Sequence, residues 1–451
     1  MRIRYKGIML AALIFSVAVG PACDTLATAA SKKRPSLPAF LSQAYLQGSM
    51  QGKSGAALDL NGNGHQDLVI GAPYARHRGA TGAVLVYHGT GNGFRKRPDA
   101  VIKGKGNLGW SLVSLGGDLF AAGAYSGSGD NVSLSGTVSV YGGGSVPQKL
   151  VTLEGDDAMD RFGYSLAAGD LDHDGNTDLI VGAPLHSPEP AFYQKGAVYI
   201  YFGPAFDPAD RLDIPATDDR EGIGFSLATG DINADGKDDL LMEAAGKVVG
   251  FYGGETFSEP GDFDAYPDVV FYCGDRGFGR SIAVLPDVDD DGFNDLAVGA
   301  YQAAIGNTDT GRLFILKGGE GPRDVDLDTP AATAEIISRI DGEDNCGQFA
   351  AAILPVPEMG GEGLRYLAVS AVHADGNPWP MTGKIFIFNA SALNADTTVD
   401  SAIAIPGGAR DMHLGTFLAL IKDKMWLVAG APTERANTGS VRLFDLEAVN
   451  Q

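Results

Sequence analysis

The fold is decided by Phe162-Gly163-Tyr164-Ser165 and, further along, by Leu179-Ile180-Val181-Gly182-Ala183-Pro184. The first signature is an apolar residue, Gly, any residue and often Ser. It recurs six more times, at spacings of roughly 54 to 68 residues, which indicates a repeat architecture. The glycines of the seven copies are Gly52, Gly109, Gly163, Gly224, Gly279, Gly347 and Gly415.

Two apolar segments follow each start. The first, as in Leu179 to Pro184, is a short uninterrupted apolar run closed by a turn signal, which is typical of a strand buried on both faces. The second begins with Gly and is rich in Val, Ile, Tyr and Phe, as in Gly196 to Tyr201, and this composition favours another strand. A more variable outer strand, for example Gln148 to Leu153 or Ala334 to Ile340, completes each unit.

Four strands are too few to bury their own faces, and stacking such sheets around one axis solves this problem. We therefore predict an all-β chain, a seven-bladed β-propeller of four-stranded antiparallel blades, over residues 37–451. The last copy ends on its third strand near Phe444. We expect Leu37 to Leu46 to supply the missing strand and close the last blade, because closure removes two exposed sheet edges. The alternative is an unclosed ring after a disordered leader.

The N-terminal residues read as an export signal over 1–23, followed by a linker over 24–36. Arg2, Arg4 and Lys6 precede an apolar run that is too short for a transmembrane helix. Two processing sites compete, namely a lipobox-like sequence ending at Cys23, which would carry a lipid anchor, and an A-x-A pattern ending at Ala29. We expect an exported protein, at the cell surface as a lipoprotein or free in the extracellular space or periplasm, and no transmembrane helix.

Four copies insert an acidic loop between the start signature and the buried strand. Oxygen-bearing side chains at positions 1, 3, 5 and 9, with Gly at 6 for a sharp turn, suit a cation of calcium size, and position 7 can offer its backbone carbonyl. We predict about four Ca²⁺ ions, and no catalytic or other cofactor-binding residues. The candidate metal residues are Asp59, Asn61, Asn63, His65 and Asp67; Asp170, Asp172, Asp174, Asn176 and Asp178; Asp231, Asn233, Asp235, Lys237 and Asp239; and Asp287, Asp289, Asp291, Phe293 and Asp295.

These loops differ from an EF-hand, which needs a bidentate acid at position 12. In all four loops that position holds an apolar residue inside the predicted buried strand, namely Ile70, Val181, Met242 and Val298. Position 9 is therefore the expected closing ligand. The competing interpretation is a set of solvated Asx turns without a metal, since Asp, Asn and Gly favour turns in any case.

The residues Phe162-Gly163 through Pro184, with the Asp170 loop between them, resemble the FG-GAP repeat of the integrin alpha N-terminal propeller. A similar repeat accompanies the catalytic domain of glycosylphosphatidylinositol-specific phospholipase D. The resemblance covers about Gln51 to Leu446, and it implies calcium in the acidic loops and a role in ligand recognition. Copy four departs from the pattern, with Glu243-Ala244-Ala245 in place of Gly-Ala-Pro, and copy six has Cys346 in place of Phe.

Charge and motifs narrow the function. A formal net charge of −22, from 34 basic and 56 acidic residues, argues against nucleic acid as a partner. The seven histidines are scattered, and the chain has no Gly-x-Ser-x-Gly or His-Glu-x-x-His motif. We therefore expect a recognition or adhesion module for an extracellular protein or glycan, not an enzyme. The alternatives are a propeller-based hydrolase or lyase acting on extracellular glycan or lipid, and a purely structural envelope protein.

Two further expectations concern single residues. Cys273 and Cys346 could form one bridge or remain two buried thiols, and the sequence leaves this open. Loops that follow the second strand of each unit should gather on one face of the ring and form the contact surface. Trp379, between two prolines, is a candidate aromatic anchor on that face, or else it packs against its own rigid turn.

Overall fold

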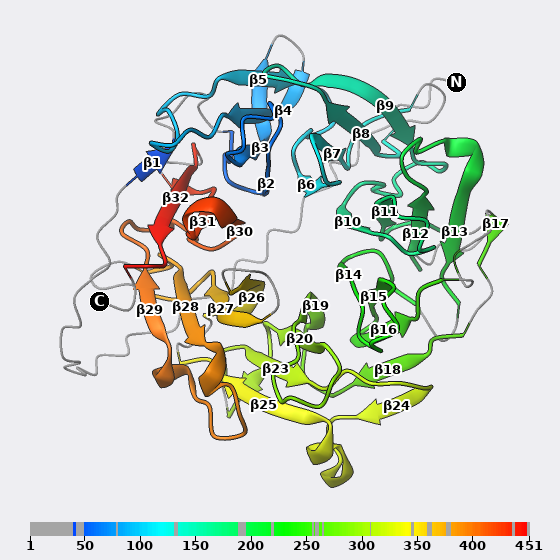
Figure 1. Ribbon diagram of the computed structural model, residues 1–451, viewed down its shortest axis with the longest axis vertical. Coiled ribbons are helices and arrows are strands. Elements are labelled where there is room, and N and C mark those ends of the chain that lie inside the picture. The colour runs from blue at the N-terminus through cyan, green and yellow to red at the C-terminus, as the bar shows by residue number, and fades with distance from the viewer. Residues whose placement is uncertain are drawn as a thin grey trace, which may run out of the picture. The chain divides into compact units, whose positions relative to one another are not determined.

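The computed structural model forms a ring of seven blades, each built on four antiparallel strands, which confirms the predicted propeller (Figure 1). We number the blades 1 to 7 by their first strands. The structure describes residues 39–41, 49–77, 80–129, 134–187, 195–217, 221–254, 257, 261–263, 266–306, 308–343, 347–358, 363–375, 380–434 and 438–448. The predicted signal over 1–23, the linker over 24–36, Cys346 and Trp379 lie outside these residues.

The strands of blades 1 to 4 follow the predicted segments. Blade 1 consists of β2 (Gly55–Leu58), β3 (Asp67–His77), β4 (Ala80–Tyr87) and β5 (Ala100–Lys103). Blade 2 consists of β6 (Ser111–Ser114), β7 (Leu119–Ala124), β8 (Thr137–Gly142) and β9 (Gln148–Glu154). Blade 3 consists of β10 (Ser165–Gly169), β11 (Asp178–Ala183), β12 (Ala197–Tyr201) and β13 (Arg211–Pro215). Blade 4 consists of β14 (Leu227–Gly230), β15 (Asp239–Ala244), β16 (Lys247–Phe251) and β18 (Val269–Tyr272).

Blades 5 to 7 complete the ring. Blade 5 consists of β19 (Phe278–Leu285), β20 (Asp295–Ala300), β23 (Arg312–Leu316) and β25 (Ile336–Asp341). Blade 6 consists of β26 (Phe349–Pro357), β27 (Leu364–Ala371), β28 (Lys384–Asn389) and β29 (Ile403–Pro406). Blade 7 consists of β30 (Leu418–Ile421), β31 (Trp426–Ala431), β32 (Ser440–Asp445) and, from the other end of the chain, β1 (Ala39–Leu41), which pairs antiparallel with β32.

Short elements decorate the outer edges. The strands β17 (Gly261–Asp262) and β24 (Arg323–Asp326) add in parallel to blades 3 and 4, and β21 (Ala304–Ile305) pairs with β22 (Thr308–Asp309). The 3₁₀ turns are η1 (Pro208–Asp210), η3 (Pro330–Ala334), η4 (Ala390–Ala392), η5 (Val399–Ser401) and η6 (Lys422–Lys424). Ala334 thus ends a 3₁₀ turn and does not begin the outer strand of blade 5. Among the described residues, no helix is both long and apolar enough to cross a bilayer.

The first strand of each blade lies innermost, and the first strands of neighbouring blades contact one another around the axis (Figure 1). The apolar cores lie between blades. For example, Ile180 and Ile200 of blade 3 pack with Met242 and Phe251 of blade 4, and all four side chains are fully buried. Each sheet therefore buries the faces that it could not cover alone.

The Ser and Gly residues that recur in the repeat have a direct structural role. Ser165 Oγ in blade 3 donates to the carbonyl of Gly224 in blade 4 at 2.7 Å, and the same bond joins Ser54 to Gly109 and Ser111 to Gly163. A Cβ at Gly182 would overlap the Gly224 carbonyl, so glycine there allows the start of the next blade to approach the buried strand. The Gly-x-Ser start and the glycine of the buried strand are thus one contact between blades.

Candidate functional site

The four acidic loops join the first and second strands of blades 1, 3, 4 and 5, so all four lie on one face of the ring. In each loop the Asp at position 1 accepts the backbone N–H groups of positions 5 and 6. In blade 3, for example, the Asp170 carboxylate accepts from Asp174 N at 3.1 Å and from Gly175 N at 3.0 Å. This pattern recurs at Asp59, Asp231 and Asp287, so the backbone winds around the first carboxylate in every copy.

The Asp at position 9 is buried and anchors each loop to its own blade. Asp178 accepts the N–H of Leu171 at 2.9 Å and that of Gly203, beyond the third strand, at 2.9 Å. Equivalent pairs of bonds hold Asp67, Asp239 and Asp295, and all four residues are fully buried. Burial raises the pKa of Asp178, Asp239 and Asp295 to about 7, despite these backbone donors. The carboxylates therefore lie in surroundings that lack compensating positive charge.

Two loops gather carboxylates tightly enough to share one cation. In blade 3 the groups are Asp170, Asp172 and Asp178, and in blade 5 they are Asp287, Asp289 and Asp291, with ligand oxygens within 4.8 Å of one another. Asp289 Oδ1 is buried and has no hydrogen-bond partner among the described residues. A hard cation would satisfy such an oxygen, so these donor sets fit calcium. Asp174 and Asp295 lie outside these two groups.

The loops of blades 1 and 4 carry Asn at position 3, namely Asn61 and Asn233, and no triple carboxylate group forms there among the described residues. At position 7, the backbone N–H of His65, Asn176, Lys237 or Phe293 donates to the side chain at position 5. The side chain of His65 turns away to Asp423 of blade 7, with 3.1 Å between His65 Nδ1 and Asp423 Oδ2. The backbone at position 7 thus closes the turn in every copy, and in blade 1 the side chain at this position contacts blade 7.

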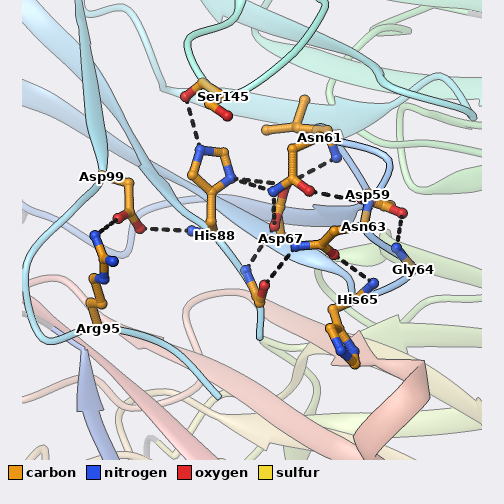
Figure 2. Close-up of polar contacts among 12 residues, drawn as sticks. Asp59, Asn61, Asn63, Gly64, His65, Asp67, His88, Arg95, Asp99 and Ser145 are labelled. Atoms are coloured by element: carbon orange, nitrogen blue, oxygen red, sulfur yellow. Dashed lines mark hydrogen bonds and ion pairs between the residues drawn. The ribbon is translucent and has the colours of Figure 1, made fainter. Parts of the chain in front are cut away.

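In blade 1, nitrogen donors of the protein face the carboxylate that would close the site (Figure 2). His88 Nδ1 lies 3.0 Å from Asp67 Oδ2, and Asn61 Nδ2 lies 3.1 Å from the same oxygen. The other ring nitrogen of His88 lies 2.8 Å from the carbonyl of Ser145. Burial lowers the pKa of His88, but the bonds to Ser145 and Asp67 outweigh this and raise it overall. The protein's own nitrogen donors therefore already compensate this carboxylate.

Blade 5 shows a related arrangement at the residue equivalent to His88. Lys317 Nζ contacts the Asp289 carboxylate and lies 3.2 Å from Asp291 Oδ2. The equivalent residues in blades 3 and 4 are aromatic, namely Phe202 and Tyr252, and bring no charge. Blade 3, with four loop carboxylates and no basic side chain against them among the described residues, is the most open to an added cation.

Sequence reasoning missed the role of position 8. Asp238 accepts the backbone N–H of Asp170 in the preceding blade at 2.9 Å, and Asn294 Nδ2 donates to the carbonyl of Asp231 at 2.6 Å. Gln66 Oε1 likewise accepts the N–H of Lys422 in blade 7 at 2.5 Å. Position 8 is polar in all four loops, and this was the signal available in the sequence. The contacts that position 8 makes with neighbouring blades become visible only in the folded ring.

A further carboxylate group, which the sequence analysis did not predict, lies by the connection that follows β11. His186 Nδ1 is 3.0 Å from Asp160 Oδ2 and 3.8 Å from Asp157 Oδ2. The hydrogen bond to Asp160 raises the pKa of His186 despite its partial burial. This cluster joins the start of blade 3 to the turn after its buried strand, and we treat it as an ion-paired brace.

Of the two cysteines in the propeller, Cys273 is half-buried and forms no disulfide with any described residue. Burial raises the pKa of this thiol to about 12, so it is poorly reactive at neutral pH. Cys346 lies outside the described residues, so the predicted alternatives of a bridge or two thiols stay a prediction.

Comparison with known proteins matches the FG-GAP repeat at residues 52–87, 162–201 and 278–316, which are copies one, three and five. The chain is 35% identical to integrin alpha-PS5 of Drosophila melanogaster over 167 residues, which is 35% of this chain and 16% of that protein. It is 34% identical to mouse integrin alpha-IIb over 171 residues, 35% of this chain and 16% of that protein. It is also 34% identical to rat phosphatidylinositol-glycan-specific phospholipase D over 171 residues, 34% of this chain and 20% of that protein.

Proposed function

We propose that this chain, which carries FG-GAP repeats, is an extracellular or cell-surface recognition module whose propeller is stabilised by calcium. The observation that supports this most directly is the blade 3 loop, where three carboxylates lie within 4.8 Å of one another beside an inter-blade contact. Similarity to integrin alpha chains supports an adhesive role, although the matched region is only 16% of the length of those integrins.

Calcium would be held by Asp170, Asp172 and Asp178 in blade 3 and by the corresponding oxygens in blades 4 and 5. Oxygen donors this numerous favour Ca²⁺ over Mg²⁺, which keeps several of its waters. At affinities of about 0.1 to 1 mM and about 1 mM calcium, each site would stabilise the fold by about 0.4 to 1.4 kcal/mol. Blade 1 is the weakest of the four candidates, because His88 and Asn61 already face Asp67.

Recognition would use the face opposite the acidic loops, where the connections after the second strands gather. Those connections vary in length while the strands that carry them are buried, which is the usual division between binding loops and scaffold. The net charge of −22 disfavours nucleic acid and anionic lipid surfaces as partners. The partner class is therefore an extracellular protein or glycan.

The test is binding of the full mature chain to arrays of extracellular matrix proteins and glycans, in 1 mM calcium and in excess chelator. We expect selective binding that weakens when calcium is removed, together with a lower melting temperature in chelator. Absence of selective binding in either buffer would contradict recognition. An unchanged melting temperature would contradict the metal assignment alone.

The alternative function is a hydrolase or lyase acting on extracellular glycan or lipid. The similarity to phosphatidylinositol-glycan-specific phospholipase D is the observation that favours it. That similarity covers 20% of the rat protein and carries no activity to this chain by itself. Turnover of any arrayed glycan or of glycosylphosphatidylinositol substrates would favour this alternative.

The proposed export by the signal over 1–23, with a lipid at Cys23 or cleavage near Ala29, is tested by the mass of the mature N-terminal peptide.

A further inference from the structure

The variable residue between Gly and Ser in the start signature forms an arc around the axis on the face opposite the acidic loops. Lys53 Nζ lies 4.6 Å from the ring centroid of Trp110 in the next blade. Trp110 lies 5.5 Å from Tyr164, and Tyr164 lies 5.5 Å from Phe225. The arc ends at Arg280, whose guanidinium lies 4.1 Å from the Phe225 ring centroid. One side chain from each of blades 1 to 5 therefore contributes to a continuous aromatic and basic surface.

The two cations that end this arc differ in their partners. Arg280 Nη1 lies 3.7 Å from Glu243 Oε2, a carboxylate that replaces the usual glycine in the buried strand of blade 4. Lys53 is half-buried, and no carboxylate among the described residues pairs with it. Burial lowers its pKa, with no opposing charge to restore it. In a chain of net charge −22, an unpaired and partly desolvated ammonium is unusual.

Lys53 lines a cavity of about 360 Å³ together with Tyr74, Trp110, His373, His413 and Thr433. None of the described residues that line it is acidic. With this volume, the cavity is large enough to admit an amino-acid side chain. One face of Trp110 is covered by Lys53, and Tyr125 lies 4.5 Å away, so this indole offers little free surface for stacking of a sugar ring.

One residue that lines the cavity, His413, also has an unpaired ring nitrogen. Thr433 Oγ1 donates to the carbonyl of Asp411 at 2.6 Å, and therefore accepts from His413 Nδ1 at 2.8 Å. This leaves Nε2 of the neutral imidazole as an acceptor, and it is buried with no partner among the described residues. Because this nitrogen has no exposed surface, a ligand in the cavity could not reach it in this conformation, and the polar contact that the cavity offers is Lys53.

We propose that this axial cavity binds an acidic side chain of an extracellular peptide, with the carboxylate paired to Lys53. A single ammonium without a cluster of backbone N–H donors matches a monovalent carboxylate better than a phosphate dianion. The inference rests on the proposed recognition role, since it names the ligand class of the same face.

The test uses the full mature chain in calcium, titrated with the peptide N-acetyl-Gly-Asp-Gly-amide and with its Asn counterpart, while the Trp indole NMR signals are followed. We expect the Asp peptide to shift one indole signal saturably, and the Asn peptide to bind at least tenfold more weakly. Lys53→Met should weaken binding of the Asp peptide at least fivefold. Lys105→Met, which removes an exposed lysine, should leave it unchanged.

Equal binding of the two peptides, or full binding by a folded Lys53→Met variant, would overturn the proposal. Binding of galacturonate in place of the Asp peptide would overturn the peptide as ligand class. Lys53→Gln serves as a second variant if Lys53→Met does not fold. A partner found on the arrays whose binding ignores both Lys53 variants would leave the recognition role standing and reject this site.

Discussion

The Asp238 carboxylate of blade 4 accepts the backbone N–H of Asp170 in blade 3 at 2.9 Å, and thus ties one acidic loop to the first residue of the next. Asn294 Nδ2 of blade 5 donates to the Asp231 carbonyl of blade 4, and Gln66 Oε1 of blade 1 accepts the N–H of Lys422 in the short turn of blade 7. The acidic loops of blades 3, 4 and 5 are therefore coupled, and disturbing one of these loops should be felt at the adjacent one.

Replacing Asp238 with Ala should lower the free energy of unfolding by about 1 to 3 kcal/mol, because it removes a hydrogen bond to a charged acceptor and leaves the Asp170 N–H without its partner. Urea unfolding in calcium measures this. Asp400→Ala removes an exposed carboxylate on a 3₁₀ turn and should change stability by less than about 0.5 kcal/mol. Equal effects of the two substitutions would show that the bond between loops contributes nothing.

Calcium should act mainly through blade 3 and little through blade 1. Asp172→Asn keeps an acceptor for the Asp174 N–H but removes one charge, so it should reduce the calcium-induced stabilisation by about one site, or about 0.4 to 1.4 kcal/mol. Asp59→Asn, which removes a loop carboxylate of blade 1 at position 1 because position 3 there is already Asn61, should leave that stabilisation nearly unchanged. The measurement is the urea midpoint with and without chelator. A larger loss for Asp59→Asn would reverse the proposed order of the sites.

His88→Ala should destabilise the protein by about 1 to 3 kcal/mol in chelator, because Asp67 is fully buried and would lose a charged donor. Calcium should restore part of this loss, since a cation could then take the place of the imidazole. Melting curves of the variant at several calcium concentrations check this. A variant that responds to calcium no more than the parent would argue that blade 1 holds no cation in either form.

Much of the ring could be predicted from the sequence because the same structural constraints act on equivalent positions of each repeat. The buried run Leu179 to Ala183 is apolar throughout since both of its faces are covered, and Gly182 is required by the adjoining blade. These constraints act within one unit or between equivalent positions of neighbours. They therefore appear in a single sequence as residue types that recur at a regular spacing.

The differences among the acidic loops could not be predicted in the same way. The loop motif gave no account of His88 or Lys317, which follow the third strand and reach the carboxylates only once the hairpin is folded. The role of Lys53 could not be predicted either, because Lys53 occupies the position of the signature that accepts any residue. Its neighbours Trp110, His373 and His413 belong to three other blades, and only closure of the ring brings them together.

Gly182→Ala should destabilise the fold by at least about 2 kcal/mol, because the added methyl group would overlap backbone atoms of Gly224, which cannot rotate away. The Ser165 hydrogen bond across the same contact would be strained as well. Gly408→Ala, at a site with open space around the added atom, is the control and should be nearly neutral. Similar unfolding midpoints for the two variants would contradict the assigned role of the close approach.

Acid should destabilise the propeller partly through His373. Burial, with a smaller contribution from the neighbouring His413, lowers the pKa of His373 to about 4. The rings of the two histidines lie 4.8 Å apart, so the two imidazolium charges would repel each other. Because the folded state binds this proton more weakly than the unfolded chain, the contribution of His373 is fully present above about pH 6.5 and is lost as the pH falls towards 4.

His373→Gln should therefore lose less free energy of unfolding between pH 7 and pH 5 than the parent. The control His173→Asn, which replaces an exposed histidine, should show the same loss as the parent. Urea midpoints at the two pH values decide between these outcomes, and a parental slope in His373→Gln would mean that other groups carry the acid sensitivity.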